Sequence, residues 1–182
     1  MSDDFSETKK SSKLVYSGKL LKVYEDEVVL PDGNTARREY IAHPGAAVIL
    51  ALFSDNSILL ERQYRYAVSQ HCYELPAGKL EPDEPSIETA KRELLEETGY
   101  VAQQWSVVCT MLPCIGYADE RIECFLARDL SYQGSSLDDG EFLETLRLPV
   151  PKALEWVRDG KIRDSKTMLG LLWLDRILSG GW

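Results

Sequence analysis

Apolar residues occur along the chain in short runs separated by clusters of turn-forming residues. The run AAVILAL at positions 46–52 is continuous, which is typical of a strand that is buried on both faces. The dipeptide Asp32-Gly33 separates two strand-like segments and predicts a hairpin of residues 19–30 and 35–41. Further strands are expected at residues 58–65, 72–75, 105–112, 121–130 and 142–148.

Helical patterns are confined to a few segments. The clearest covers residues 85–98, because Pro85 suits the first helical position and Gly99 suits the position after the last. Two further helices are expected at residues 151–159 and 164–178. Strands therefore dominate, with one internal helix and two helices near the end. This order predicts an α/β (α+β) fold in which helices cover the faces of a mixed sheet.

Composition and charge narrow the class of protein. The chain has 182 residues, of which 44% are hydrophobic, and this is enough for one domain with its own core. The formal net charge is −9, so binding to nucleic acid is not expected. No apolar stretch approaches the roughly 18 residues that a membrane span needs. An anionic substrate would require a positively charged group between it and this acidic protein.

The cysteines do not suggest a zinc site. Cys72, Cys109, Cys114 and Cys124 form no CxxC pair, and the chain has only two histidines. The first residues, MSDDFSETKKSS, contain no apolar segment of the kind found in signal peptides. We therefore expect a reduced, cytoplasmic protein with a flexible polar leader at residues 1–12.

Three glutamates lie close together on the helix expected at residues 85–98. Glu93, Glu96 and Glu97 have i, i+3 and i+4 spacing, which places their carboxylates on one face. Like charges at this spacing destabilise an isolated helix. A solvated acidic face is one interpretation. The other is a site for a divalent cation, and carboxylate oxygens suit Mg²⁺ or Mn²⁺.

The surrounding pattern favours the metal site. The segment GKLEPDEPSIETAKRELLEETGY matches the Nudix box at every fixed position. At typical amino-acid usage, such a match would arise by chance with a probability of about 10⁻⁸. The fixed positions are Gly78, Glu84, Arg92, Glu93, Glu96, Glu97 and Gly99. The chain thus resembles a Nudix hydrolase. The flanking segments RQYRYAV, YELPAGKLEPDE and GKIRDSKTMLGLL are similar to the ADP-ribose and nucleoside diphosphate sugar pyrophosphatase branch.

This resemblance covers roughly residues 16–177 and implies an architecture. The Nudix fold is an α/β/α sandwich around a mixed sheet. In this branch an N-terminal β-hairpin extension commonly reaches across to a second subunit, which gives a homodimer. The expected organisation is therefore a leader at 1–12, a hairpin subdomain at 13–45 and a Nudix hydrolase domain at 46–182.

The resemblance also implies an activity. It is the metal-dependent hydrolysis of the diphosphate bond of nucleoside diphosphate sugars, including ADP-ribose, to a nucleoside monophosphate and a sugar phosphate. Two or more Mg²⁺ ions, or Mn²⁺ in their place, would be held by Glu93 and Glu97, with Glu96 and the main-chain carbonyl of Ala77. Arg92 precedes Glu96 by four residues, so an ion pair would hold that carboxylate in place.

The general base is expected in the acidic loop SSLDDGEFLETL. Asp138, Asp139 and Glu141 are the candidates, and Glu141 best matches the acidic residue of the branch as base, metal ligand or both. A flexible, solvated loop is the alternative interpretation.

Substrate contacts are implied at several further positions. Arg65 matches an arginine that contacts phosphate, for which a guanidinium is well suited. Glu74 and Glu120 match positions that meet ribose or sugar hydroxyls. Glu39 and His43 fall where contacts from the partner subunit would arise, although His43 fits a structural role better than a catalytic one.

One segment departs from the ADP-ribose-selective members. Gly116 is kept in the turn that follows the box, but Ile115 stands where a proline is expected. We therefore expect a broad nucleoside diphosphate sugar hydrolase. Two alternatives remain open at this point. One is a Nudix hydrolase of dinucleoside polyphosphates or nucleoside triphosphates, and the other is a non-catalytic Nudix-fold module that only binds its ligand.

Overall fold

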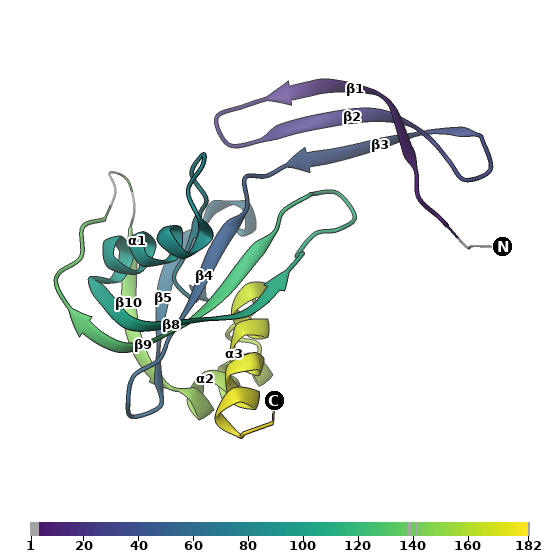
Figure 1. Cartoon of the computed structure of the whole chain (residues 1–182). Coiled ribbons are helices and arrows are strands. Elements are labelled where there is room, and N and C mark those ends of the chain that lie inside the picture. The colour runs from purple at the N-terminus through teal and green to yellow at the C-terminus, as the bar shows by residue number, and fades with distance from the viewer. Residues whose placement is uncertain (1–3, 138–139, 141, 182) are drawn as a thin grey trace. The chain divides into compact units, whose positions relative to one another are not determined.

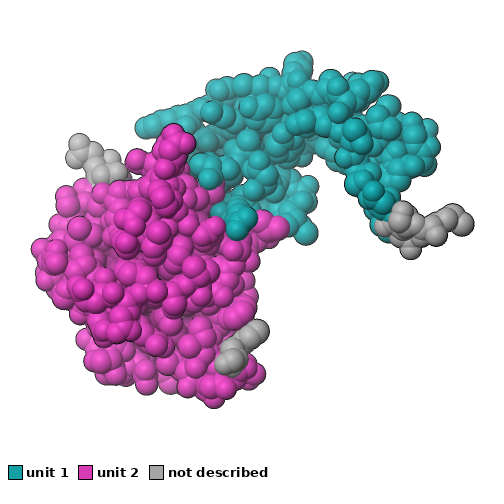
Figure 2. Space-filling model, in the orientation of Figure 1, with its two compact units in different colours: residues 1–44, 114–121 teal, residues 45–113, 122–182 magenta. Residues whose placement is uncertain are grey.

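The chain divides into two units, which Figure 2 shows in different colours. The structure is a computed structural model that describes residues 4–137, 140 and 142–181. Unit 1 comprises residues 1–44 and 114–121, and unit 2 comprises residues 45–113 and 122–182. Each unit has its own sheet structure and is described by itself.

Unit 1 is built on a three-stranded antiparallel sheet in the order β1-β2-β3 (Figure 1). Its strands are β1 (Thr8–Ser17), β2 (Lys22–Val29) and β3 (Thr35–Ala42). The hairpin expected from Asp32-Gly33 is confirmed, because β2 and β3 pair in register across it. Gly33 has a positive φ of 86°, and Asp32 Oδ1 accepts the Asn34 N–H at 2.9 Å. Residues 114–121 join this unit where the Ile41 N–H donates to the Tyr117 carbonyl at 2.9 Å.

The extent of strand β1 differs from the expected boundary of the flexible leader. Residues 8–12 belong to this strand, although the sequence analysis expects a flexible leader through residue 12. All ten residues of β1 are exposed, so no hydrophobic alternation marks the strand in the sequence. Its main-chain pairing with β2 defines it instead, and an ion pair between Lys10 and Glu27 at 2.8 Å supports the pairing.

A four-stranded mixed sheet forms the centre of unit 2, in the order β7-β4-β9-β8. Its strands are β7 (Ala77–Lys79), β4 (Ala46–Ala51), β9 (Ile122–Tyr132) and β8 (Tyr100–Met111). Strands β4 and β9 are parallel, and the other pairs are antiparallel. Every residue of β4 is buried, which confirms the prediction from its continuous apolar run. The short strand β7 is not marked by any pattern in the sequence.

Alternate residues of β4 lie in two separate hydrophobic clusters, one on each face of the sheet. Val48 and Leu50 belong to one cluster, and Ile49 belongs to the other. Helix α1 (Ser86–Thr98) contributes Leu94 to the cluster of Ile49, whereas helix α3 (Ser165–Leu178) contributes Leu171 to the cluster of Val48. Helices therefore cover both faces of the mixed sheet, as the sequence predicts (Figure 1).

A second, antiparallel sheet of unit 2 has the order β10-β5-β6. Its strands are β10 (Leu143–Pro149), β5 (Ser57–Arg65) and β6 (Gln70–Glu74). A 3-10 turn at Tyr66–Val68 connects β5 to β6, and helix α2 (Val150–Arg158) follows β10 directly. The first five residues of β5 are buried, so this strand runs from the core of unit 2 toward its surface.

The ends of α1 show why it is a helix at these residues. The sequence analysis expects Pro85 at the first helical position. In the structure it stands one position before the helix, and its ψ of 138° is that of extended backbone. Gly99 ends the helix in the left-handed region with a φ of 75°, and its N–H donates to the Leu95 carbonyl at 2.8 Å. A Cβ atom on Gly99 would lie 2.7 Å from the Gly134 backbone, so only glycine fits there.

No helix among the described residues is long and apolar enough to cross a membrane.

Candidate active site

Helix α1 holds the predicted glutamates beside strand β7. A Cβ atom at Gly78 would lie 1.8 Å from Glu93 Oε1, so any other residue at this position would push the Glu93 carboxylate away from the β7 backbone. On the next turn, Glu97 Oε2 accepts the Ala77 N–H at 3.2 Å. The structure thus brings Ala77, Glu93 and Glu97 together, which are three of the four predicted metal-binding residues.

Arg92 lies among three carboxylates of the same segment. Its guanidinium is 3.1 Å from Glu84 Oε2, 2.9 Å from Glu93 Oε1 and 3.0 Å from Glu96 Oε2. The predicted ion pair between Arg92 and Glu96 is confirmed. Hydrogen bonds from Arg92 and then Thr89 lower the pKa of Glu84 to about 2. The hydrogen bond to Glu84 is the largest cause that raises the pKa of Arg92, and the bonds to Glu96 and Glu93 add to it. Partial burial of Arg92 opposes the rise.

The role of Glu84 as a partner of Arg92 is not evident from helical spacing. Glu84 precedes the helix, so the i, i+3 and i+4 rules do not apply to it. Its carboxylate is held by the Thr89 hydroxyl at 2.7 Å and by both Arg92 Nε and Arg92 Nη2. The fixed spacing of Glu84 and Arg92 in the box is the only signal in the sequence that links them.

Glu61 is a further carboxylate at this site that the sequence analysis does not identify. It is the last of the five consecutive buried residues of β5, in the middle of the strand, and 0% of its surface is exposed. Neither of its carboxylate oxygens has a hydrogen-bond donor among the residues that the structure describes. Burial raises the pKa of Glu61 to about 8, and the neighbouring Glu97 carboxyl partly opposes the rise.

A second charged cluster lies at the ends of β5 and β6. Arg65 binds Glu74 through two parallel hydrogen bonds, Nε to Oε1 at 2.7 Å and Nη2 to Oε2 at 2.9 Å. Lys166 of α3 also binds Glu74, and it lies 2.9 Å from Asp164. Burial raises the pKa of Glu74, but Arg65 and Lys166 outweigh this effect and lower that pKa to about 2. The Arg65 side chain is 46% exposed, so it also faces solvent.

The segment around Lys166 fixes α3 to the end of β6. Asp164 caps the helix by accepting the Thr167 N–H at 3.0 Å. The Thr167 hydroxyl in turn accepts the Leu75 N–H at 2.9 Å. These contacts hold Glu74 and Lys166 in fixed positions relative to each other.

A cavity of about 280 Å³ opens beside Glu97 in unit 2. Its other lining residues are Gln63, Tyr64, Gly140, Phe142 and Leu143. The cavity has both aromatic side chains and a carboxylate, a combination that suits a polar ligand with a ring.

The remaining predicted site residues lie elsewhere. Asp138, Asp139 and Glu141 are outside the described residues. Glu39, Gly116 and Glu120 belong to unit 1, where His43 Nδ1 lies 3.6 Å from Glu120 Oε1. In the same unit, Ile115 is 81% exposed.

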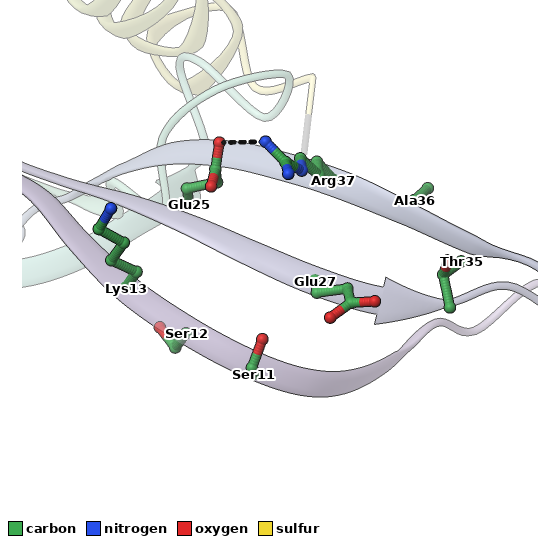
Figure 3. A pocket seen from close by; sticks show the side chains of 8 residues that line it. All are labelled: Ser11, Ser12, Lys13, Glu25, Glu27, Thr35, Ala36 and Arg37. Carbon is green, nitrogen blue, oxygen red and sulfur yellow. Dashed lines mark hydrogen bonds and ion pairs between the residues drawn. The ribbon is translucent and has the colours of Figure 1, made fainter.

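Unit 1 also carries a hollow on its sheet, which Figure 3 shows from close by. Its volume is about 580 Å³, and charged side chains of all three strands contribute to its lining. Arg37 and Glu25 form an ion pair there at 3.4 Å. All of its lining side chains except that of Ala36 are polar or charged.

The residues of unit 2 fit a divalent cation, although they are not gathered around one point. Within the described part of the chain, no three acidic, histidine or cysteine side chains converge in a way that could hold a metal ion. Arg92 engages Glu93 and Glu96, and Glu97 faces Ala77. The fit rests on the space that Gly78 leaves for Glu93, on the unsatisfied carboxylate of Glu61, and on donors that are all oxygen.

Comparison with known protein families places this arrangement in context. The NUDIX domain family matches residues 42–168 of the chain. The chain belongs to the Nudix family. The Nucleoside diphosphate sugar hydrolase N-terminal domain family matches residues 7–41, which include the strands β1 and β2.

Several relatives are similar over most of their length. The ADP-ribose pyrophosphatase of Bacillus subtilis (strain 168) is 36% identical over 162 residues, which cover 88% of each chain. The methanol dehydrogenase activator of Bacillus methanolicus is 37% identical over 172 residues, with 93% of each chain covered. The GDP-mannose pyrophosphatase of Salmonella paratyphi B is 34% identical over 147 residues, with 76% of each chain covered.

A solved structure supports the Nudix fold. The crystal structure of an ADP compounds hydrolase matches with a TM-score of 0.86 at 20% identity, and 98% of each chain is covered. The expected Nudix fold is therefore confirmed. As a Nudix protein with an intact box, the chain is a hydrolase that acts on pyrophosphate bonds.

Proposed function

We propose that this Nudix hydrolase cleaves the diphosphate bond of nucleoside diphosphate sugars, including ADP-ribose, with the help of Mg²⁺ or Mn²⁺. The products would be a nucleoside monophosphate and a sugar phosphate. The observation that carries the proposal is the position of Glu93 against Gly78, with Glu97 on the Ala77 backbone. The names of the relatives support the substrate class, because they include both an ADP-ribose and a GDP-mannose pyrophosphatase.

The carboxylates of α1 would hold two or more divalent cations. Glu93 and Glu97 would be the main ligands, with Glu96 and the Ala77 carbonyl beside them. Bound Mg²⁺ supplies Lewis acidity and lowers the pKa of a bound water. Arg92 orients Glu93 and Glu96 through its ion pairs at 2.9 and 3.0 Å.

Arg65 is suited to bind the diphosphate. Its guanidinium is partly exposed and presents donors in a planar arrangement that matches phosphate oxygens. When Arg65 turns from Glu74 to the substrate, Lys166 remains to balance the charge of Glu74. The cavity beside Glu97 would receive a ring of the substrate against Tyr64 or Phe142.

In the reaction, a water oxygen forms a bond to one phosphorus atom. The bond between that phosphorus and the bridging oxygen breaks, and the bridging oxygen leaves with the other phosphate. Glu141 would accept the proton of the water, with Asp138 and Asp139 as the alternatives in the same loop. All three lie outside the described residues.

The proposal includes a homodimer in which unit 1 reaches the second subunit. Strand β1 is exposed along its whole length and carries Leu14, Val15 and Tyr16 at its exposed surface. An exposed strand with apolar residues favours association with another chain. Glu39, Gly116 and Glu120 would then contact the substrate of one subunit or the other. The four cysteines are free, which favours the reducing environment of the cytoplasm.

The test is product analysis with ADP-ribose, GDP-mannose, a dinucleoside polyphosphate and a nucleoside triphosphate. Each is incubated with Mg²⁺, with Mn²⁺ and with a chelator. We expect nucleoside monophosphate and sugar phosphate from the first two substrates, only when metal is present. Pyrophosphate released from the triphosphate, without cleavage of the sugar nucleotides, would overturn the proposal. ¹⁸O-labelled water shows which phosphorus is attacked.

A further inference from the structure

Glu61 is the most unusual charged group in unit 2. Its side chain has no exposed surface, and four consecutive buried residues, Ser57 to Leu60, precede it on β5. Burying a carboxyl group is unfavourable unless donors satisfy it, and nearly all buried polar groups have such partners. Neither oxygen of Glu61 has a donor among the described residues. An aliphatic side chain would extend the apolar run ILL of this strand without that penalty.

The nearest cationic side chains are engaged elsewhere. Arg65 and Lys166 both bind Glu74, which is the neighbour of Glu61 across the β5–β6 register. Their charges reach Glu61 only at longer range, and the charge of Glu74 opposes them. After burial, the side chain that most affects the pKa of Glu61 is that of Glu97, another carboxyl. Glu61 is therefore directed at the acidic cluster of α1 and not at a cation of the protein.

A bound metal cation would balance the charge of these carboxyl groups. Glu97 links Glu61 to strand β7, because it affects the pKa of Glu61 and accepts the Ala77 N–H at 3.2 Å. We propose that Glu61 is part of the dication-binding set: it lies next to Glu97, helps to hold this ligand in place, and adds negative charge to the centre by losing its proton when the dication binds. The inference rests on the proposed function, because it assumes that Glu97 binds the metal.

The consequence is that metal affinity depends on a residue outside the box. Partners that hold a metal ligand typically change affinity by about 10–100-fold when they are removed. Glu61→Gln keeps the shape and can donate to the Glu97 carboxylate, but it cannot ionise. Glu61→Leu can do neither and replaces a buried carboxyl group by an apolar side chain. We expect Mn²⁺ to bind at least about ten-fold more weakly to either variant.

The experiment is a Mn²⁺ titration of the full-length protein at one fixed pH, followed by the electron paramagnetic resonance signal of free Mn²⁺. Thermal unfolding of the same samples in chelator reports folding without metal. We expect Glu61→Gln and Glu61→Leu to unfold no lower than the wild-type chain in chelator. A purely structural role would lower the unfolding temperature and leave Mn²⁺ affinity unchanged.

Matched controls separate the possible failures. Glu88→Gln removes the same charge from the exposed face of α1, where Glu88 pairs with Lys91 at 2.8 Å, and should leave Mn²⁺ affinity unchanged. Glu93→Gln should abolish binding. If Glu93→Gln weakens binding and both Glu61 variants retain wild-type affinity, the role of Glu61 is overturned and the proposed function stands. If Glu93→Gln also binds normally, the metal site itself is misplaced.

Discussion

The two charged clusters of unit 2 differ in how their charges balance. At α1, one arginine faces three carboxylates, Glu84, Glu93 and Glu96. At the end of β6, two cations, Arg65 and Lys166, face Glu74 and Asp164. The first cluster has an excess of negative charge, and the second is balanced.

This difference indicates two separate tasks. An excess of carboxylates that one arginine only partly neutralises is suited to attract a dication. A balanced cluster with a partly exposed arginine is suited to exchange a carboxylate for a phosphate, because a second cation remains on that carboxylate. An acidic protein thus acquires two positive contacts for a diphosphate, one from bound metal and one from Arg65.

The largest effect is expected at the unbalanced cluster. Glu93→Gln removes a proposed ligand and should lower kcat with ADP-ribose by about 10³-fold, because metal-ion stabilisation of a transition state is worth several kcal/mol. Steady-state kinetics at saturating Mg²⁺ measures the effect. Glu88→Gln on the same helix is the control and should keep wild-type kcat. A fall of less than ten-fold in Glu93→Gln would show that this cluster is not the metal site.

A smaller loss is expected in the loop that follows. Glu141→Gln should lower kcat by at least about 10², the usual contribution of a general base, while the unfolding temperature is unchanged. Asp138→Asn and Asp139→Asn, measured in the same way, test the two alternative bases. Near-normal turnover in Glu141→Gln together with a large loss in Asp139→Asn would move the role to Asp139.

The sequence predicts those parts of the fold that have a local signal. The continuous apolar run of β4 indicates burial on both faces, and Gly99 marks the end of α1. Strand β1 has no such signal, because all its side chains are exposed and only main-chain pairing defines it. Pairing between strands depends on tertiary structure, which a pattern along one strand does not contain.

The same limit applies to the candidate site: contacts within one helix can be predicted from the sequence, and contacts between distant segments cannot. Spacing along one helix is sufficient to predict the Arg92–Glu96 ion pair. Contacts between distant segments are not predictable in this way: Lys166 and Glu74 are 92 positions apart. Glu61 is missed for a related reason. In the run ILLERQ it separates the apolar residues from the polar ones, a pattern typical of the surface end of a strand, and only the packing of β5 shows that it is buried.

The balanced cluster predicts an effect on substrate binding. Arg65→Lys keeps the positive charge but loses the paired donors of the guanidinium, so KM for ADP-ribose should rise about ten-fold with a smaller change in kcat. Arg62→Lys is the matched control, because Arg62 lies on the same strand and makes only a 3.6 Å surface pair with Glu144. Equal changes in both variants would contradict a specific phosphate contact at Arg65.

The smallest effect concerns stability at low pH. The folded-state pKa of Glu74 is about 2, against an ordinary value of 4.5. A group with a lowered folded-state pKa contributes stability that is fully present above its unfolded value and is lost as pH falls through its folded value. The contribution of Glu74 should therefore disappear between pH 4.5 and about 2. Lys166→Met weakens the interaction that lowers this pKa, so its stability should fall less steeply over that range, by on the order of 1 kcal/mol.

The measurement is the unfolding temperature of the wild-type and Lys166→Met proteins from neutral pH to pH 2.5, in chelator. Lys152→Met is the control, because Lys152 pairs with Glu155 at the exposed surface of α2 and such pairs contribute little. If the Lys166→Met and wild-type curves converge toward low pH while the Lys152→Met curve stays parallel to wild type, Lys166 holds the charge of Glu74 in the folded state. Parallel curves for all three proteins would mean that Arg65 alone holds Glu74. The second cluster would then have no cation in reserve when Arg65 turns to the substrate.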